Sequence, residues 1–205
     1  MIAPLDTPPM GQPVDLRAAI GDAVHRYEGS GNVAALLQAL FRICDGAMAD
    51  ALIAAVEPWR QMPEVAGPVY EHVVKEQPNN PRALVTLAQA YWLTGRGPDV
   101  VGDLANRAIA ADPTYPWGWH LWAVTESDPR ERMVRWQQVV QRFPDDDTAR
   151  AALADNAAGV ASAEHDTHAQ QVALEAFRHL LAKATTVEQQ NAVQTALSAI
   201  EGWKL

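Results

Sequence analysis

The one cluster with metal-binding chemistry in the sequence is His165-Asp166-Thr167-His168. Histidines three residues apart share one face of a helix and could chelate zinc or nickel weakly, with Glu164 and Asp166 near enough to complete a site. The same residue types also start helices, because Asp166 or Thr167 can cap the first turn while both imidazoles stay in solvent. We therefore expect a helix start here, and a metal site held by His165 and His168 is the weaker alternative.

Two other chemically active groups have simple structural interpretations. Cys44 ends an apolar stripe, which predicts a buried and unreactive thiol. As the single cysteine it also excludes an intrachain disulfide and a multi-cysteine zinc site. The run Asp145-Asp146-Asp147 follows Pro144, an order typical of a helix cap and first turn, with a cation site as the minor alternative.

No catalytic motif stands out. The sequence has no Gly-x-x-x-x-Gly-Lys loop, no His-Glu-x-x-His and no Gly-x-Ser-x-Gly. Gly95-Arg96-Gly97 lies between two helical segments, so it predicts a turn and not a dinucleotide-binding loop. Acidic residues outnumber basic ones by 25 to 16, and a net charge of -9 disfavours nucleic acid as a partner. We expect a protein that is not an enzyme and needs no cofactor.

Composition and hydropathy place the chain among globular proteins. It has 205 residues, of which 48% are apolar and 20% charged. The start, MIAPLDTPPMGQP, lacks the basic and apolar regions of a signal peptide, and no apolar run is long enough for membrane insertion. We expect a cytoplasmic location, with residues 1–13 as an extended proline-rich tail outside the core.

From residue 16 onward the apolar spacing is that of helices, and strand signals are missing. The expected helices are 16–27, 33–41, 49–56, 63–75, 82–94, 99–111, 116–126, 130–142, 147–160, 167–183 and 186–202. The connections between them are short, so successive helices should pack antiparallel.

These helices repeat at intervals marked by prolines. Pro78, Pro113 and Pro144 follow helix ends and are separated by 35 and 31 residues, near the tetratricopeptide period. Small and large apolar residues recur at matching distances from these prolines. In one unit they are Leu84, Leu87, Ala88, Tyr91, Val101, Ala105 and Ala108, and in the next Trp119, Trp122, Ala123, Trp136 and Val139.

This pattern resembles the tetratricopeptide repeat (TPR) family. The resemblance is clear over 81–113 and 116–144, partial over 47–78 and weak over 147–183, and 14–46 and 147–205 are helical flanks. It implies an all-α fold, a right-handed superhelical stack of antiparallel helix hairpins (a TPR-like α-solenoid) with helical caps, as a single domain over 14–205. Arg132, Glu126 and Pro58 depart from the family pattern, as degenerate end repeats often do. Trp122 is expected to fill a large space between helices.

The resemblance also implies a concave side lined by the first helix of each hairpin. Trp117 lies nearly opposite the packed Trp119 on a helical wheel, which turns it toward that side. The residues expected to bind a partner there are Arg82, Val85, Gln89, Trp92, Trp117, His120 and Val124. Trp92, Trp117 and His120 should keep appreciable exposure. Because Val85, Thr86 and Gln89 replace the polar and basic residues that family members use, a clamp for acidic C-terminal peptides is not supported.

We therefore expect an adaptor or scaffold that buries an extended or helical protein segment against Trp92, Trp117 and His120, with Arg82 orienting it. The alternative is a structural subunit or assembly factor of a larger complex that uses its outer face. A small helical metal-binding protein or enzyme is the third possibility.

Overall fold

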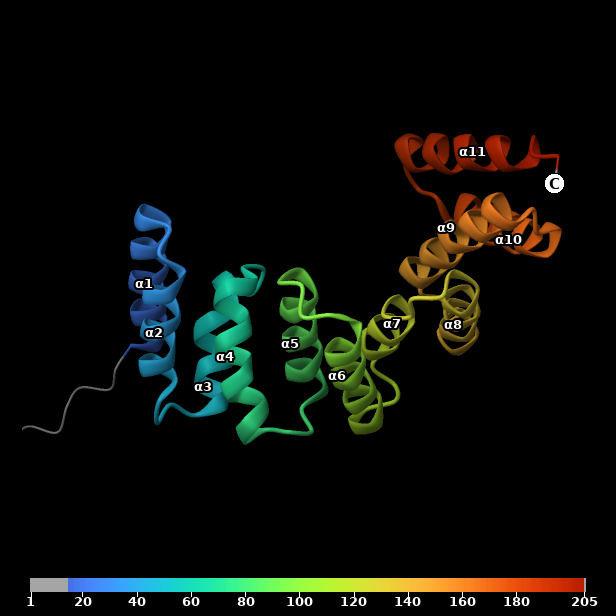
Figure 1. The fold of residues 1–205 in the computed structure, drawn as a ribbon. Coiled ribbons are helices and arrows are strands. Elements are labelled where there is room, and N and C mark those ends of the chain that lie inside the picture. The colour runs from blue at the N-terminus through green and yellow to red at the C-terminus, as the bar shows by residue number, and fades with distance from the viewer. Residues whose placement is uncertain (1–14, 205) are drawn as a thin grey trace, which may run out of the picture. The chain divides into compact units, whose positions relative to one another are not determined.

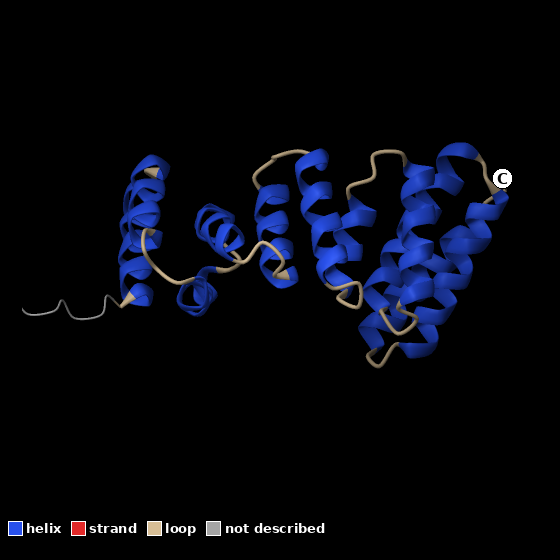
Figure 2. Cartoon of the chain, turned by 90° about the horizontal axis from the view of Figure 1, so that it is seen from below, coloured by secondary structure: helices blue, strands red, loops and turns tan. Residues whose placement is uncertain are grey.

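The computed structural model describes residues 15–204, and within that range all regular structure is helical (Figure 2). The chain divides into two compact units, Met1–Pro78 and Asn79–Leu205. The tail predicted over residues 1–13 lies outside the described residues. None of the described helices is both long and apolar enough to cross a lipid bilayer.

Figure 1 shows the helices in chain order. The first unit holds α1 (Leu16–Ser30), α2 (Val33–Cys44), α3 (Ala49–Val56), the 3-10 turn η1 (Glu57–Trp59) and α4 (Pro63–Glu76). The second holds α5 (Pro81–Leu93), α6 (Pro98–Ala111), α7 (Pro116–Val124), α8 (Pro129–Arg142), α9 (Asp147–Glu164), α10 (Thr167–Lys183) and α11 (Val187–Glu201).

In the first unit, α1 packs on α2 and α3, while α4 packs on α2 and α3. The core comes from residues one helical turn apart, such as Leu36, Leu40 and Cys44 on α2. The end of α4 also caps the start of α3, since the Glu76 carboxylate accepts a hydrogen bond from Ala49 N at 2.9 Å. Thus the hydrogen bond completes the start of α3 within its own hairpin, and the packing of α1 on α3 and of α2 on α4 joins the two hairpins.

In the second unit the loops set where each helix begins. The helices α5, α6, α7 and α8 all begin with proline, which lacks an N–H and is preorganised for the first helical position. The residue before the helix often accepts the hydrogen bond from a free N–H of the first turn. Asn80, Asp128, Asp146, Asp166 and Thr186 do so for α5, α8, α9, α10 and α11.

Alanine side chains allow these helices to approach closely. Ala88, Ala105, Ala108 and Ala123, the small repeat positions expected from the sequence, are all fully buried. An apolar cluster of this unit extends from α7 to α11 and includes Trp136, Val139 and Phe177. The predicted all-α stack of helix hairpins is therefore confirmed.

Trp122 packs against this cluster, but it fills less of the space between helices than the sequence predicts. Trp122 is half-buried, with the Arg135 guanidinium 4.7 Å from its ring centre and Trp119 meeting it edge-on at 5.7 Å. The deeply buried tryptophan is instead Trp136 on α8, at 5% exposure. Because Trp122 lies at the edge of the interface, its removal leaves less empty volume in the core.

We predict that Trp136→Ala lowers the free energy of unfolding by about 3–5 kcal/mol, because it empties a large buried space. Trp122→Ala should cost clearly less, since water can reach the vacated site. Urea denaturation of both variants measures the difference. An equal or larger cost for Trp122→Ala would contradict this assignment.

Candidate functional site

Three aromatic side chains of the second unit form a continuous row. The Trp117 ring meets His120 edge-on at a centroid distance of 5.0 Å, and His120 meets Trp136 in the same way at 5.4 Å. The outer member is exposed, at 45% for Trp117, whereas Trp136 is buried. The row therefore leads from the surface of α7 to the buried face of α8.

His120 is held in this row by the start of α9. Its Nε2–H donates a hydrogen bond to Asp146 Oδ2 at 2.6 Å, because an ionised carboxylate can only accept. The other oxygen of Asp146 caps α9 by accepting from Ala149 N at 2.9 Å. One carboxylate thus joins two successive hairpins. His120 is only 8% exposed, so the expectation that it presents itself to a partner is wrong.

A cavity of about 460 Å³ adjoins the inner end of the row. Its lining comes from the end of α5, the start of α6, the end of α7, the middle of α8 and the middle of α9. These residues are Trp92, Pro98, Val124, Thr125, Glu126, Ser127, Arg132, Trp136, Ala152, Asp155 and Asn156. Trp92 is 42% exposed. The cavity therefore has aromatic surface from two helices.

Most polar groups of this cavity are used by the protein itself. Arg132 donates from Nε to the Asn156 side-chain oxygen at 2.7 Å and from a terminal nitrogen to the Glu126 backbone oxygen at 2.9 Å. The Glu126 carboxylate pairs with Arg135. A hydrogen bond from the Asp128 N–H is the main cause that lowers the pKa of the Glu126 carboxyl.

Asp155 differs from these groups. Within residues 15–204 it has neither an ion-pair partner nor a hydrogen bond to its side chain, and desolvation by burial raises the pKa of its carboxyl. The Asp155 residue is nevertheless exposed, so its carboxylate lines the cavity where solvent or a ligand can reach it.

The other residues expected in the groove fall into two sets. Arg82 and Gln89 are exposed, and Val124 lines the cavity. Val85 is buried, which contradicts its placement on an open wall. Val85 and His120 occupy matching positions, seven residues after their prolines. Val85 lies on α5, which packs directly on α7, whereas His120 is covered by Trp136 of α8 and by Asp146 at the start of α9.

Two residues of this site were missed. Trp136 lies on a second helix, where the sequence pattern predicts core packing only. Asp155 could have been found, because it lies eleven residues after Pro144, as Gln89 and Val124 do after Pro78 and Pro113. The register that located Gln89 and Val124 also assigns Asp155 to the same wall.

The metal-like cluster forms a helix start, as expected. Asp166 caps α10 by accepting from His168 N and Ala169 N. Arg130 pairs with Asp166 and Glu164, the two acidic residues that a metal site would need. Among residues 15–204 no group of three or more His, Cys, Asp or Glu side chains is placed to hold a metal ion. Asp146 and Asp147 likewise serve as the cap and first turn of α9.

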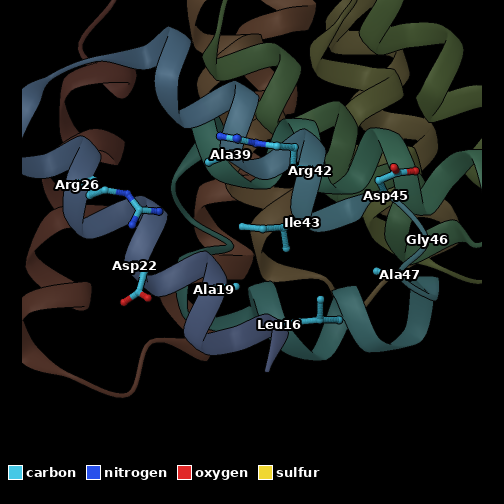
Figure 3. A pocket seen from close by; sticks show the side chains of 10 residues that line it. All are labelled: Leu16, Ala19, Asp22, Arg26, Ala39, Arg42, Ile43, Asp45, Gly46 and Ala47. Atoms are coloured by element: carbon cyan, nitrogen blue, oxygen red, sulfur yellow. The ribbon is translucent and has the colours of Figure 1, made fainter. Parts of the chain in front are cut away.

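The first unit has a cavity of its own, of about 580 Å³, between α1 and α2. Figure 3 shows Arg26 of α1 and Ile43 of α2 extending toward the space between the helices. Asp22, Arg42 and Asp45 also line it. Charges of both signs surround this cavity and no aromatic ring lines it, so it offers less binding surface than the cavity beside Trp92.

Cys44 is buried as predicted, and burial raises the pKa of its thiol to about 11. The thiolate is the reactive form, and a rise of the thiol pKa from 9.0 to about 11 lowers the thiolate fraction at neutral pH about 100-fold. We predict negligible reaction with a disulfide reagent in the folded protein and complete reaction in denaturant. Rapid modification of the native chain would show that the thiol is accessible.

The double role of Asp146 predicts an unusually costly substitution. Asp146→Ala removes a helix cap, at about 1 kcal/mol, and leaves buried His120 without its acceptor, at about 1–3 kcal/mol more. Asp128→Ala is the matched control, since Asp128 caps α8 by the same geometry, accepting from Glu131 N at 2.9 Å. Chemical denaturation should show the larger loss for Asp146→Ala, and equal losses would mean that the His120 contact is energetically neutral.

Comparison with known proteins agrees on the fold. No family model and no curated protein matches the sequence. A crystal structure of MamA superposes with a TM-score of 0.56 at 14% identity, over 84% of this chain and 97% of MamA. A thermophilic TPR protein of Thermus thermophilus gives a TM-score of 0.56 at 16% identity, over 89% of this chain and 99% of that protein. The helix-hairpin stack of this chain is therefore a TPR-like fold.

Proposed function

We propose that this protein is a non-catalytic adaptor whose second unit holds a segment of another protein. The observation that carries the proposal is a pair of exposed tryptophans on the second unit: Trp92 lines the cavity, and Trp117 lies at the outer end of the row whose inner members are His120 and Trp136. Exposed tryptophans on rigid helices are typical of binding hot spots, because they offer large contact area at little entropic cost.

The supporting shell makes this surface rigid. Trp117 packs on His120, and the Asp146 hydrogen bond fixes the His120 ring. Arg132 is fixed at the other end by Asn156 and the end of α7. A partner segment would therefore meet side chains that are already ordered, which reduces the entropic cost of binding.

We predict that the double substitution Trp92→Ala with Trp117→Ala abolishes capture of partner peptides while changing stability by no more than about 1 kcal/mol per site, because both rings are half in solvent. Panning a library of short random peptides on the full chain, followed by affinity measurement and thermal melting, tests both halves of the prediction.

The matched control is Leu93→Ala. Leu93 is an exposed apolar residue next to Trp92 that does not line the cavity, so its removal should leave peptide capture intact. Unchanged capture by the double tryptophan variant would overturn the proposed binding surface.

A second candidate function, a structural subunit that docks by an outer face, is supported by α2. Val33, Leu37 and Phe41 are spaced one turn apart along this helix, and Phe41 is 75% exposed. A row of exposed apolar residues fits docking against an apolar surface of another subunit.

For this candidate we predict that Leu37→Ser with Phe41→Ser prevents association without lowering the melting temperature, because both side chains are exposed. Leu36→Ser on the buried face of α2 is the control and should destabilise the chain strongly. Association is measured by the sedimentation coefficient of the chain after it is mixed with fractions of an extract from its native host. An unchanged sedimentation profile would remove support for this candidate.

A further inference from the structure

Among the polar groups of the cavity beside Trp92, the Asp155 carboxylate and the buried Trp136 Nε1–H have no hydrogen-bond partner in residues 15–204. Arg132 and Glu126 are engaged by neighbouring protein groups, whereas Asp155 has no partner among the described residues. Burial raises the pKa of Asp155 and no cation lowers it, which means that Arg132 does not neutralise this carboxylate. The cavity thus combines apolar walls with an uncompensated negative charge.

The protein already shows which group suits such surroundings. Arg135 lies over the Trp122 ring at 4.7 Å, and Arg142 lies over the Trp119 ring at 4.9 Å. In each case a guanidinium covers an indole face and also donates a hydrogen bond to a backbone oxygen, of Trp122 or of Pro113. In the described part of the chain no such cation lies over Trp92, which lines the cavity together with Asp155.

From this arrangement we propose that the cavity binds a basic side chain, arginine in preference to lysine, of the protein segment held by the adaptor. The exposed indole ring of Trp92 would pack against the planar guanidinium and its apolar stem, and Asp155 would accept its N–H groups. The proposal rests on the proposed function, because it names the residue by which the same surface selects its partner.

Charge supports a basic residue over an acidic one. The chain carries a net charge of -9, so a basic segment is attracted before contact. An acidic side chain would meet the unpaired Asp155 carboxylate, which adds repulsion to the cost of desolvation. The occupant is therefore a segment with one arginine or lysine flanked by apolar residues, which would cover Trp117 and the end of α7.

The test compares peptides that differ in one charge. Peptides selected on the full chain from a short random library should share a basic residue at a fixed position. Replacing the arginine of a selected peptide with citrulline, which keeps the shape and removes the charge, should weaken binding about tenfold or more. Tryptophan fluorescence titration measures both affinities.

Asp155→Asn should lower the affinity for the arginine peptide by a similar factor and leave the affinity for the citrulline peptide unchanged. The variant should fold normally. The pKa of Asp155 is raised in the folded chain, which means that folding disfavours the ionised carboxylate. The contribution of Asp155 to the free energy of unfolding therefore falls as pH rises through that pKa. Removing the charge should leave the melting temperature at neutral pH equal or slightly higher. Asp103→Asn on α6, which is exposed and outside the cavity, is the matched control.

The outcomes separate the two proposals. Selected peptides that lack a basic residue, or equal affinities for the arginine and citrulline peptides, would overturn this inference and leave the adaptor function standing. If the unchanged chain captures no more peptides than the Trp92→Ala, Trp117→Ala variant does, the adaptor function itself would be overturned. Loss of the arginine preference in Asp155→Asn, with the preference kept in Asp103→Asn, would support both.

Discussion

Each helix hairpin of this protein has one apolar face that only a neighbouring hairpin can cover. In the second unit the contact depends on side chains that are small enough to let helices meet, and Ala88, Ala108 and Ala123 are completely buried. Close packing also buries Val85 on α5, and it buries His120 against Trp136 and the start of α9. Residues one turn to either side, such as Trp117 and Gln89, remain open to solvent. Which residues stay exposed on this wall is thus a consequence of how tightly the helices pack.

The positions of the helices follow from the sequence because local rules and repeat rules agree. Apolar spacing locates every helix, and the prolines give the period. Small errors occur where a terminal residue decides the boundary. The helices α5, α6 and α8 begin at a proline one residue before the expected start, which the spacing of apolar residues cannot indicate. The helix α9 ends at Glu164 and not near residue 160, because the residue that stops it is His165, in a left-handed conformation with φ of 53°.

The site was less predictable than the fold, and the reason is geometric. A helical wheel gives the direction of a side chain from its own helix, and it identified Trp92 and Trp117 correctly as exposed residues. It does not show which neighbour lies in that direction. His120 points the same way as an open-wall residue, yet the cap of α9, 26 residues later, lies against it. A contact of this kind depends on how two hairpins stack, so no local pattern contains it.

The acidic residues show how the demands of folding and of binding are divided. Asp128, Asp146 and Asp166 each cap a helix, and two of them also hold a side chain from another helix through a hydrogen bond or ion pair. Asp155 is in the interior of α9, where a carboxylate cannot cap, and no cation lies close enough to lower its pKa. Alanine or glutamine at this position would serve the helix better. An exposed carboxylate that caps no helix, beside an aromatic cavity, is available to the basic side chain proposed above.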